Sequence, residues 1–227
     1  MILLQIVTDA AQTATTTAPA QQSLSLLSLI LKGGWVMIPI GIMSILSVYL
    51  MIERYLVISR ASKVDGGFMN NIRTMLLDGK TDAALSLCRS TNTPIARLLE
   101  KGIKRLGKPI KEIESAVENT GKLEIYKLEK NLSYLGIIAG IAPMMGFIGT
   151  ISGVINIFYK ISISADFGIQ QISDGLYEKM ITSAAGLLVG IIAHIAFHYL
   201  NTMIDRVSFQ LESTTVDFID LIQEPTK

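Results

Sequence analysis

The sequence is poor in charge and has only one cysteine. Only 17% of its 227 residues are charged, whereas a soluble domain usually carries about a quarter. Basic and acidic residues nearly balance, giving a formal net charge of +1, so no basic excess indicates nucleic-acid binding. Cys88 alone cannot form an internal disulfide and has no metal-ligand spacing, so its simplest interpretation is a small buried residue. Half of the residues are hydrophobic, which favours a membrane protein.

Three apolar segments are long enough to cross a bilayer, which requires about 20 residues at roughly 1.5 Å each. The sequence therefore predicts an all-α, polytopic membrane protein with a helical cytoplasmic domain. The predicted spans are 33–57, 133–160 and 179–201. Glu53 and Arg54 lie near the end of the first span and are expected to anchor it at the inner interface.

Basic residues set the predicted orientation. Fifteen of the 20 lysines and arginines lie between Arg54 and Lys130, which places this region in the cytoplasm, the N-terminus outside and the C-terminus inside. Because the apolar start of the chain lacks a basic region, we expect no signal cleavage. The remaining predicted segments are an exported flexible tail (1–22), an interfacial amphipathic helix (23–32), the cytoplasmic domain (58–132), a periplasmic loop (161–178) and a cytoplasmic C-terminal helix or tail (202–227).

The predicted cytoplasmic region is expected to be helical, because it contains no alternating apolar and polar pattern long enough for a β-strand. Thr93 followed by Pro94 is typical of a helix start, and Pro109 predicts another. No breaker separates this second helix from the span at 133–160, so one continuous helix is expected to enter the membrane. The region offers no catalytic constellation and no cofactor site, so we favour a helical bundle over an enzyme domain.

Glycine is concentrated in the second and third spans. It destabilises a water-exposed helix by roughly 0.5 to 1 kcal/mol relative to alanine, but in lipid small residues let helices approach closely. The glycines are Gly136, Gly140, Gly146, Gly149, Gly153, Gly186 and Gly190. We therefore predict that these spans pack closely against other helices.

Hydroxyl groups within the spans have two possible roles. Thr150, expected mid-span on the face of Gly146 and Gly153, could bond a backbone carbonyl one turn back or face a pore. Ser183 lies in helical register with Gly186, Gly190 and His194, which suits either packing alone or a narrow channel.

Polar residues at the outer and inner span ends are also ambiguous. Glu178 could stabilise the helix through its macrodipole or contribute to a carboxylate ring at a pore mouth. Asn156 and Lys160 suit a solvated helix end, or the same mouth. His194 and His198 could meet a metal on one helical face, but no third ligand has matching spacing, so no metal site is predicted.

Four motifs together resemble the ExbB/TolQ/MotA family of ion-driven motor channel subunits, most closely the ExbB type. The motifs are GGWVMIP at 33–39 with the Ile52-Glu53-Arg54 end of the first span, APMMGFIGTISG at 142–153, Glu178 before the third span, and TSAAGL at 182–187. The third-span motif departs from the family, because Ser183 stands where threonine is usual and Thr182 just precedes it.

The resemblance implies a homopentamer in the inner membrane of a Gram-negative bacterium. Its second and third spans would line a pore holding an ExbD-type single-span protein, whose aspartate is protonated. Work would pass to a TonB-type protein and outer-membrane transport. The implied proton pathway comprises Thr150, Ser183, Thr182, Glu178 and Asn156. TolQ-like or gliding-motor roles, and a non-conducting membrane scaffold, remain the alternatives.

Overall fold

The computed structural model describes residues 34–63, 66–163 and 168–223, which form helices and contain no strand. The helices are α3 (Met37–Ala61), α4 (Phe68–Leu77), α5 (Thr81–Ser90), α6 (Pro94–Ile103), α7 (Ile110–Glu129), α8 (Leu132–Ile163) and α9 (Ile169–Gln223). Three stretches of this helical chain are long and apolar enough to cross a membrane. The all-α, three-span prediction is therefore confirmed. The tail and interfacial helix predicted over 1–32 lie outside the described residues.

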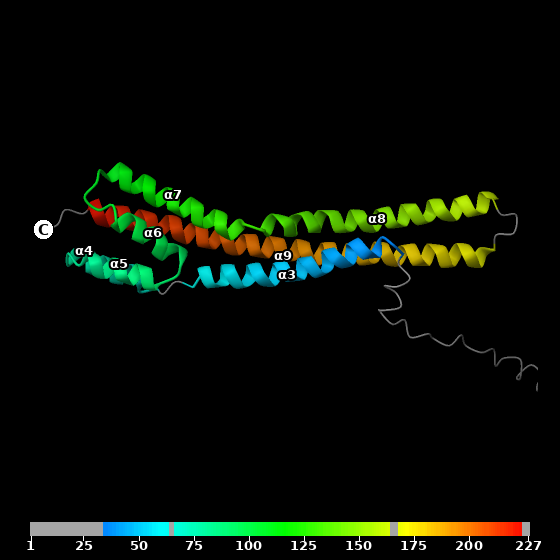
Figure 1. Ribbon diagram of the computed structural model, residues 1–227, viewed down its shortest axis with the longest axis horizontal. Helices are drawn as coiled ribbons and strands as arrows, with labels where there is room; N and C mark the ends of the chain where they lie inside the picture. Colours follow the sequence, from blue (N-terminus) through cyan, green and yellow to red (C-terminus); the bar gives the residue numbers. More distant parts are fainter. Residues whose placement is uncertain (1–33, 64–65, 164–167, 224–227) are drawn as a thin grey trace, which may run out of the picture.

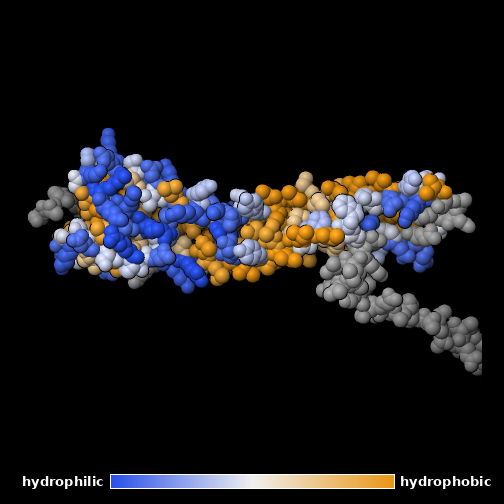
Figure 2. Space-filling model, in the orientation of Figure 1, coloured by the Kyte–Doolittle hydropathy of each residue, from blue (hydrophilic) through white to orange (hydrophobic). Residues whose placement is uncertain are grey.

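The described helices form a rod organised around α9, which runs along its whole length (Figure 1). Helices α3 and α8 pack against one part of α9, and α4 to α7 gather at the other end. Figure 2 shows a hydrophobic surface over the α3–α8–α9 part and a hydrophilic surface over the α4–α7 end. The hydrophobic part contains the three predicted spans, and the cytoplasmic location of the hydrophilic end stays a prediction.

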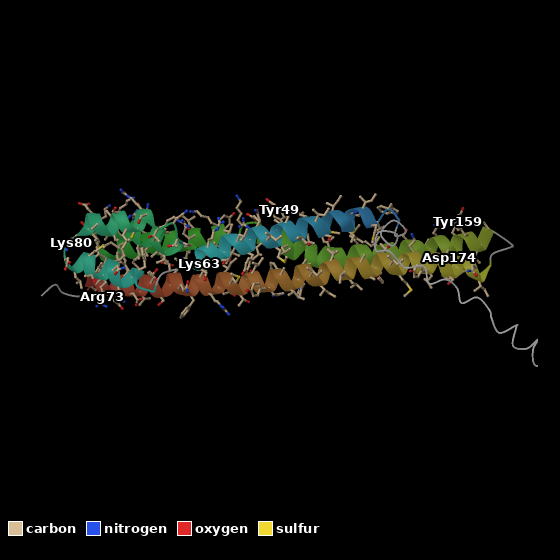
Figure 3. The ribbon with its side chains drawn as sticks, turned by 90° about the horizontal axis from the view of Figure 1, so that it is seen from below. Tyr49, Lys63, Arg73, Lys80, Tyr159 and Asp174 are labelled. Atoms are coloured by element: carbon tan, nitrogen blue, oxygen red, sulfur yellow. The ribbon has the colours of Figure 1, made fainter. Side chains whose placement is uncertain are left out.

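The two parts are stabilised by different kinds of core. In the membrane part, small side chains such as Ala142 and Ala193 are fully buried between helices, while Ile45 and Tyr49 are exposed. Figure 3 shows Tyr49 on the outside of α3. Lipid solvates such outward apolar groups as well as a protein core does, so they need no partner. At the α4–α7 end the apolar side chains turn inward, and the largest fully buried one is Phe218.

The expected continuous helix from the cytoplasm into the membrane is wrong, because α7 and α8 are separate. Lys130 has an extended ψ of 134°, and Asn131 adopts the left-handed region with φ of 68°. Asparagine tolerates this conformation better than most residues because its short side chain can bond the local backbone. Neither a glycine nor a proline stands at this break, so these two residue types do not predict it.

The segment between the second and third spans is more helical than the sequence predicted. A loop was expected over 161–178, but α8 continues to Ile163 and α9 already begins at Ile169. Packing supports these extensions, because a Cβ on Gly175 would lie 3.0 Å from Cδ1 of Ile157 across the hairpin. The predicted C-terminal helix over 202–227 is continuous with the third span as far as Gln223.

The start of α6 supplies a stability prediction. Thr93 Oγ1 accepts a hydrogen bond from the Ala96 backbone N–H at 3.3 Å, and Pro94 occupies the first helical position. Thr93→Ala is expected to lower the free energy of unfolding by about 1 kcal/mol, because that N–H loses its partner. Denaturation of the full chain in detergent measures this. Ser90→Ala, which removes an exposed hydroxyl bonded to the Leu87 carbonyl, should cost less; equal losses would contradict the capping role.

Candidate functional site

The closest approach in the membrane part is the contact between α8 and α9. A Cβ on Gly186 would lie 2.6 Å from the Ala142 carbonyl oxygen and 2.9 Å from the Gly146 Cα. A Cβ on Gly146 would in turn lie 3.0 Å from the Ser183 carbonyl oxygen. These distances join backbone to backbone, so glycine is needed at both positions for the helices to approach this closely.

The remaining glycines of the contact accommodate specific side chains. Gly149 faces Thr182, whose Cγ2 would be 2.9 Å from an added Cβ, and Thr182 is fully buried there. The aliphatic part of Lys179 lies directly over Gly153, and the ring of Pro143 lies directly over Gly190. An added Cβ at either glycine would overlap these groups.

Thr150 joins the two helices through its hydroxyl. Its Oγ1 lies 3.3 Å from the Gly146 carbonyl oxygen, one turn back, and 3.3 Å from the Lys179 carbonyl oxygen on α9. The hydroxyl carries one hydrogen that these two acceptors share, and its lone pairs stay available to accept. The bond to a backbone carbonyl one turn back is thus present, and Thr150 is half-buried.

The other proposed pathway residues differ in burial and in their distance from the α8–α9 contact. Ser183 is half-buried, with its backbone against Gly146, whereas Asn156 is exposed. Glu178 lies within α9, but its side chain is outside the described residues. The structure therefore brings Thr150, Thr182 and Ser183 together and leaves Asn156 apart.

The two histidines lie away from this contact. Both His194 and His198 are exposed, and their rings meet edge to face at a centroid distance of 4.4 Å. In the part of the chain that the structure describes, no cluster of three histidine, cysteine, aspartate or glutamate side chains is suited to a metal. His194 is exposed while Gly186 and Gly190 are buried, so it does not continue their face.

Contacts among α3, α8 and α9 define two levels along the rod, and the distance between these levels is close to the thickness of a bilayer. At the first level, Gly149 lies against both Val36 at the start of α3 and Thr182. At the second, Tyr55 and Tyr199 line one apolar groove of about 500 Å³. The intervening stretches of α3 and α9 rise about 26 to 28 Å, close to the roughly 30 Å of a hydrocarbon core. Thr150 therefore lies near the level at which α3 begins.

Two residues of this contact were missed by sequence reasoning. Lys179 contributes both its carbonyl, to Thr150, and its aliphatic stem, to Gly153. A lysine at the first position of an apolar span was the available signal, but it was counted only as a charge. Pro143 fills the space over Gly190, which only the register between α8 and α9 could reveal.

Cys88 is unrelated to this site. It is buried at the α4–α7 end, and burial, followed by the nearby Glu100 carboxylate, raises the pKa of its thiol to about 11. A thiol with so little thiolate at neutral pH is a structural residue rather than a nucleophile.

Comparison with known proteins identifies the family. Residues 90–213, more than half of the chain, match the MotA/TolQ/ExbB proton channel family, and the match includes both glycine-rich spans. The chain belongs to this family. It is 27% identical over 200 residues to the ExbB-like 1 protein of Synechocystis sp., a match covering 87% of this chain and 76% of the relative.

Of the other relatives, some are named ExbB and one is named TolQ. The biopolymer transport protein ExbB of Neisseria meningitidis is 22% identical over 174 residues, covering 70% of this chain and 78% of the relative. The Tol-Pal system protein TolQ of Haemophilus influenzae is 29% identical over 97 residues, covering 43% of this chain and 41% of the relative. Membership of the family supports a stator role of the general MotA/TolQ/ExbB type in a membrane.

Proposed function

We propose that this chain is the channel subunit of an ExbB–ExbD-type motor in the inner membrane of a Gram-negative bacterium. Such a motor uses the proton motive force to energise TonB-dependent transport at the outer membrane. The observation that carries the proposal is the family match across α6 to α9, which contains the hydroxyl-bearing α8–α9 contact. The basic region between the first two spans supports a periplasmic N-terminus and a cytoplasmic C-terminus.

In this proposal, copies of α8 and α9 surround the span of an ExbD-type partner as a homopentamer. The partner's carboxylate takes up and releases the proton, and Thr150 and Ser183 hold hydroxyl oxygens where that carboxylate or a water molecule could bond. A half-buried hydroxyl can donate to a backbone carbonyl while accepting from a neighbour, as the Thr150 geometry allows. Thr182 fixes α9 against Gly149, and Glu178 and Asn156 would lie toward the outer mouth.

Two alternative functions each have one observation in their favour. Similarity to TolQ supports service to envelope integrity with a different single-span partner. The bonding of Thr150 to two backbone carbonyls supports a scaffold that packs helices and conducts nothing. Growth on a nutrient that needs TonB-dependent uptake, compared with detergent resistance, separates the first alternative from the main proposal.

Proton flux tests the proposed pathway directly. In liposomes containing the chain and its partner, Thr150→Val or Ser183→Ala is expected to lower proton flux by at least about tenfold, a barrier increase of roughly 1.4 kcal/mol. The reason is that each change removes an oxygen and keeps a side chain of similar size. A pH-sensitive dye inside the liposomes measures the flux, and gel filtration checks assembly.

Thr202→Val is the matched control, because Thr202 makes the same backbone bond, to the His198 carbonyl at 3.0 Å, on an exposed part of α9. It should leave flux unchanged. Normal flux in both pathway variants would remove the pathway assignment. Absence of flux in the unchanged complex would favour the scaffold.

A further inference from the structure

The hydrophilic end of the rod is divided by charge. Residues 68–109, which contain α4 to α6, carry eight lysines and arginines and three acidic residues. Helix α7 carries three basic and five acidic residues, and residues 207–223 of α9 carry three acidic residues and no basic one. The first group thus has a net charge of +5, and α7 with the end of α9 has a net charge of −5.

The acidic half contains a groove between α7 and α9. The groove has a volume of about 360 Å³, and the buried side chains of Leu98 and Leu211 lie at its floor. Three carboxylates line it, those of Glu114, Glu118 and Glu212. Lys122 also lines the groove and pairs with Glu118. Glu114 and Glu212 form no ion pair with a described residue. We call this the acidic groove.

The basic half presents two lysines on the other side of α6. Gly102 faces the core, where an added Cβ would lie 3.0 Å from Val117 Cγ2. Lys104 lies about 200° further around the helix, at about 100° per residue, so it is on the face of α6 turned away from α7 and α9. Lys101 lies beside it, and both lysines are exposed. We call Lys101 and Lys104 the basic ridge.

The basic ridge keeps an excess of positive charge. Lys104 and Arg89 both donate to the same oxygen of Glu100, at 2.6 and 3.2 Å, so two cations share one carboxylate. Lys101 forms no ion pair with a described residue. The ridge is therefore able to bind further carboxylates.

The basic ridge and the acidic groove lie at the same height along the rod. Lys101 and Glu118 are the chain neighbours of Gly102 and Val117, which face each other across α6 and α7. Copies of a chain in one membrane share their orientation, so only residues at equal height can meet between neighbouring copies. Within one chain, α6 lies between the ridge and the groove, because its Leu98 lines the groove. A chain therefore cannot fill its own groove.

We propose that the basic ridge of one copy docks in the acidic groove of the next copy. The contact joins two different patches, so it is heterologous and repeats around a ring. A two-fold contact would instead place groove against groove, where like charges repel. The aliphatic stems of the lysines can cover the apolar floor while their ammonium groups reach the carboxylates. The inference rests on the assembly of several copies in the proposed function, but not on proton conduction.

Cross-linking between copies tests the docking. In a Cys88→Ala background, chains carrying Lys101→Cys are co-expressed with chains carrying Glu118→Cys. Mild oxidation is expected to give a covalent dimer with one chain of each kind, identified by mass spectrometry, and neither chain alone should give a dimer. In the control, Lys80→Cys replaces Lys101→Cys and should give at least about tenfold less mixed dimer, because Figure 3 places Lys80 at the end of the rod.

Gel filtration of the same sample separates the ways in which this proposal can fail. An assembled complex without the mixed dimer would show that another protein, or nothing, faces the groove; the docking would then be wrong while the proposed homopentamer stands. A monomeric chain would contradict both. A dimer of Glu118→Cys chains alone would show a two-fold contact and would also overturn the docking.

A charge exchange between the two chains checks the same contact. Lys104→Glu, added to the chain that carries Lys101→Cys, should slow formation of the mixed dimer by about fivefold or more, because like charges then meet at Glu114. Adding Glu114→Lys to the other chain should restore the rate, which a loss of folding in the first chain would not allow. Lys80→Glu is the matched control, since Lys80 also has an exposed ion pair within its chain, with Asp78 at 3.0 Å. It should leave the rate unchanged. A rate that the exchange does not restore would contradict the proposal.

Discussion

Gly186→Ala is expected to destabilise the packing of α8 against α9 in the membrane part. The new Cβ would lie 2.6 Å from the Ala142 carbonyl oxygen and 2.9 Å from the Gly146 Cα. Both are backbone atoms, so no rotamer change relieves the overlap, and α8 and α9 must separate. Overpacking of this kind costs about 2 to 3 kcal/mol, which for a chain of this size lowers the melting temperature by roughly 5 to 10 °C.

The control for this change is Gly140, an exposed glycine on α8. Gly140 has no atom within 4 Å of an added Cβ, so Gly140→Ala should leave the melting temperature unchanged or raise it slightly, through better helix propensity. Melting of the purified complex, followed by the loss of helical circular dichroism, measures both variants. Equal melting temperatures would mean that α8 and α9 do not meet at Gly186.

The contrast between Gly186 and Gly140 shows what glycine spacing could and could not predict. Spacing indicated that the second and third spans pack closely, but it treated Gly140 like Gly146. Which glycine meets a partner depends on the register between two helices, and no pattern within one helix contains it. The same register places Lys179 over Gly153 and its carbonyl beside Thr150.

Element boundaries were predictable where local chemistry decides them. Thr93 and Pro94 begin a helix because capping and a fixed φ act within four residues. The break at Asn131 depends instead on a conformation that asparagine tolerates but does not require. The hairpin extensions to Ile163 and from Ile169 depend on each helix packing against the other.

Charge pairing at the α4–α7 end is another feature set by tertiary structure. Glu124 is only 4% exposed, and Arg97, which lies 27 positions earlier in the sequence, donates to its Oε2 at 2.6 and 2.9 Å. Lys127 donates to the other oxygen at 2.6 Å. No pattern in the sequence distinguishes Glu124 from the other charged residues of this helix. In the fold it joins α6 to α7.

Arg97→Met is expected to lower the free energy of unfolding by about 3 kcal/mol. It leaves the buried Glu124 carboxylate with Lys127 alone, and this value is at the lower end for a broken buried pair because Lys127 remains. Adding Glu124→Gln to Arg97→Met should recover part of the loss, since no buried charge is then left unpaired. Glu118→Gln is the control: its pair with Lys122 is exposed on both sides, so it should cost less than about 1 kcal/mol.

The pH dependence of unfolding gives an independent readout of the same pair. Burial by itself raises the pKa of Glu124, but the hydrogen bonds from Arg97 and Lys127 outweigh it, so the folded-state pKa lies below the usual value of 4.5. A carboxyl group with a lowered folded-state pKa adds stability that is complete above its unfolded-state pKa and is lost as the pH falls through the folded-state pKa. Glu124→Gln should therefore reduce the loss of stability below about pH 4.5. Identical acid profiles for the unchanged protein and Glu124→Gln would show that this buried carboxylate does not hold α6 to α7.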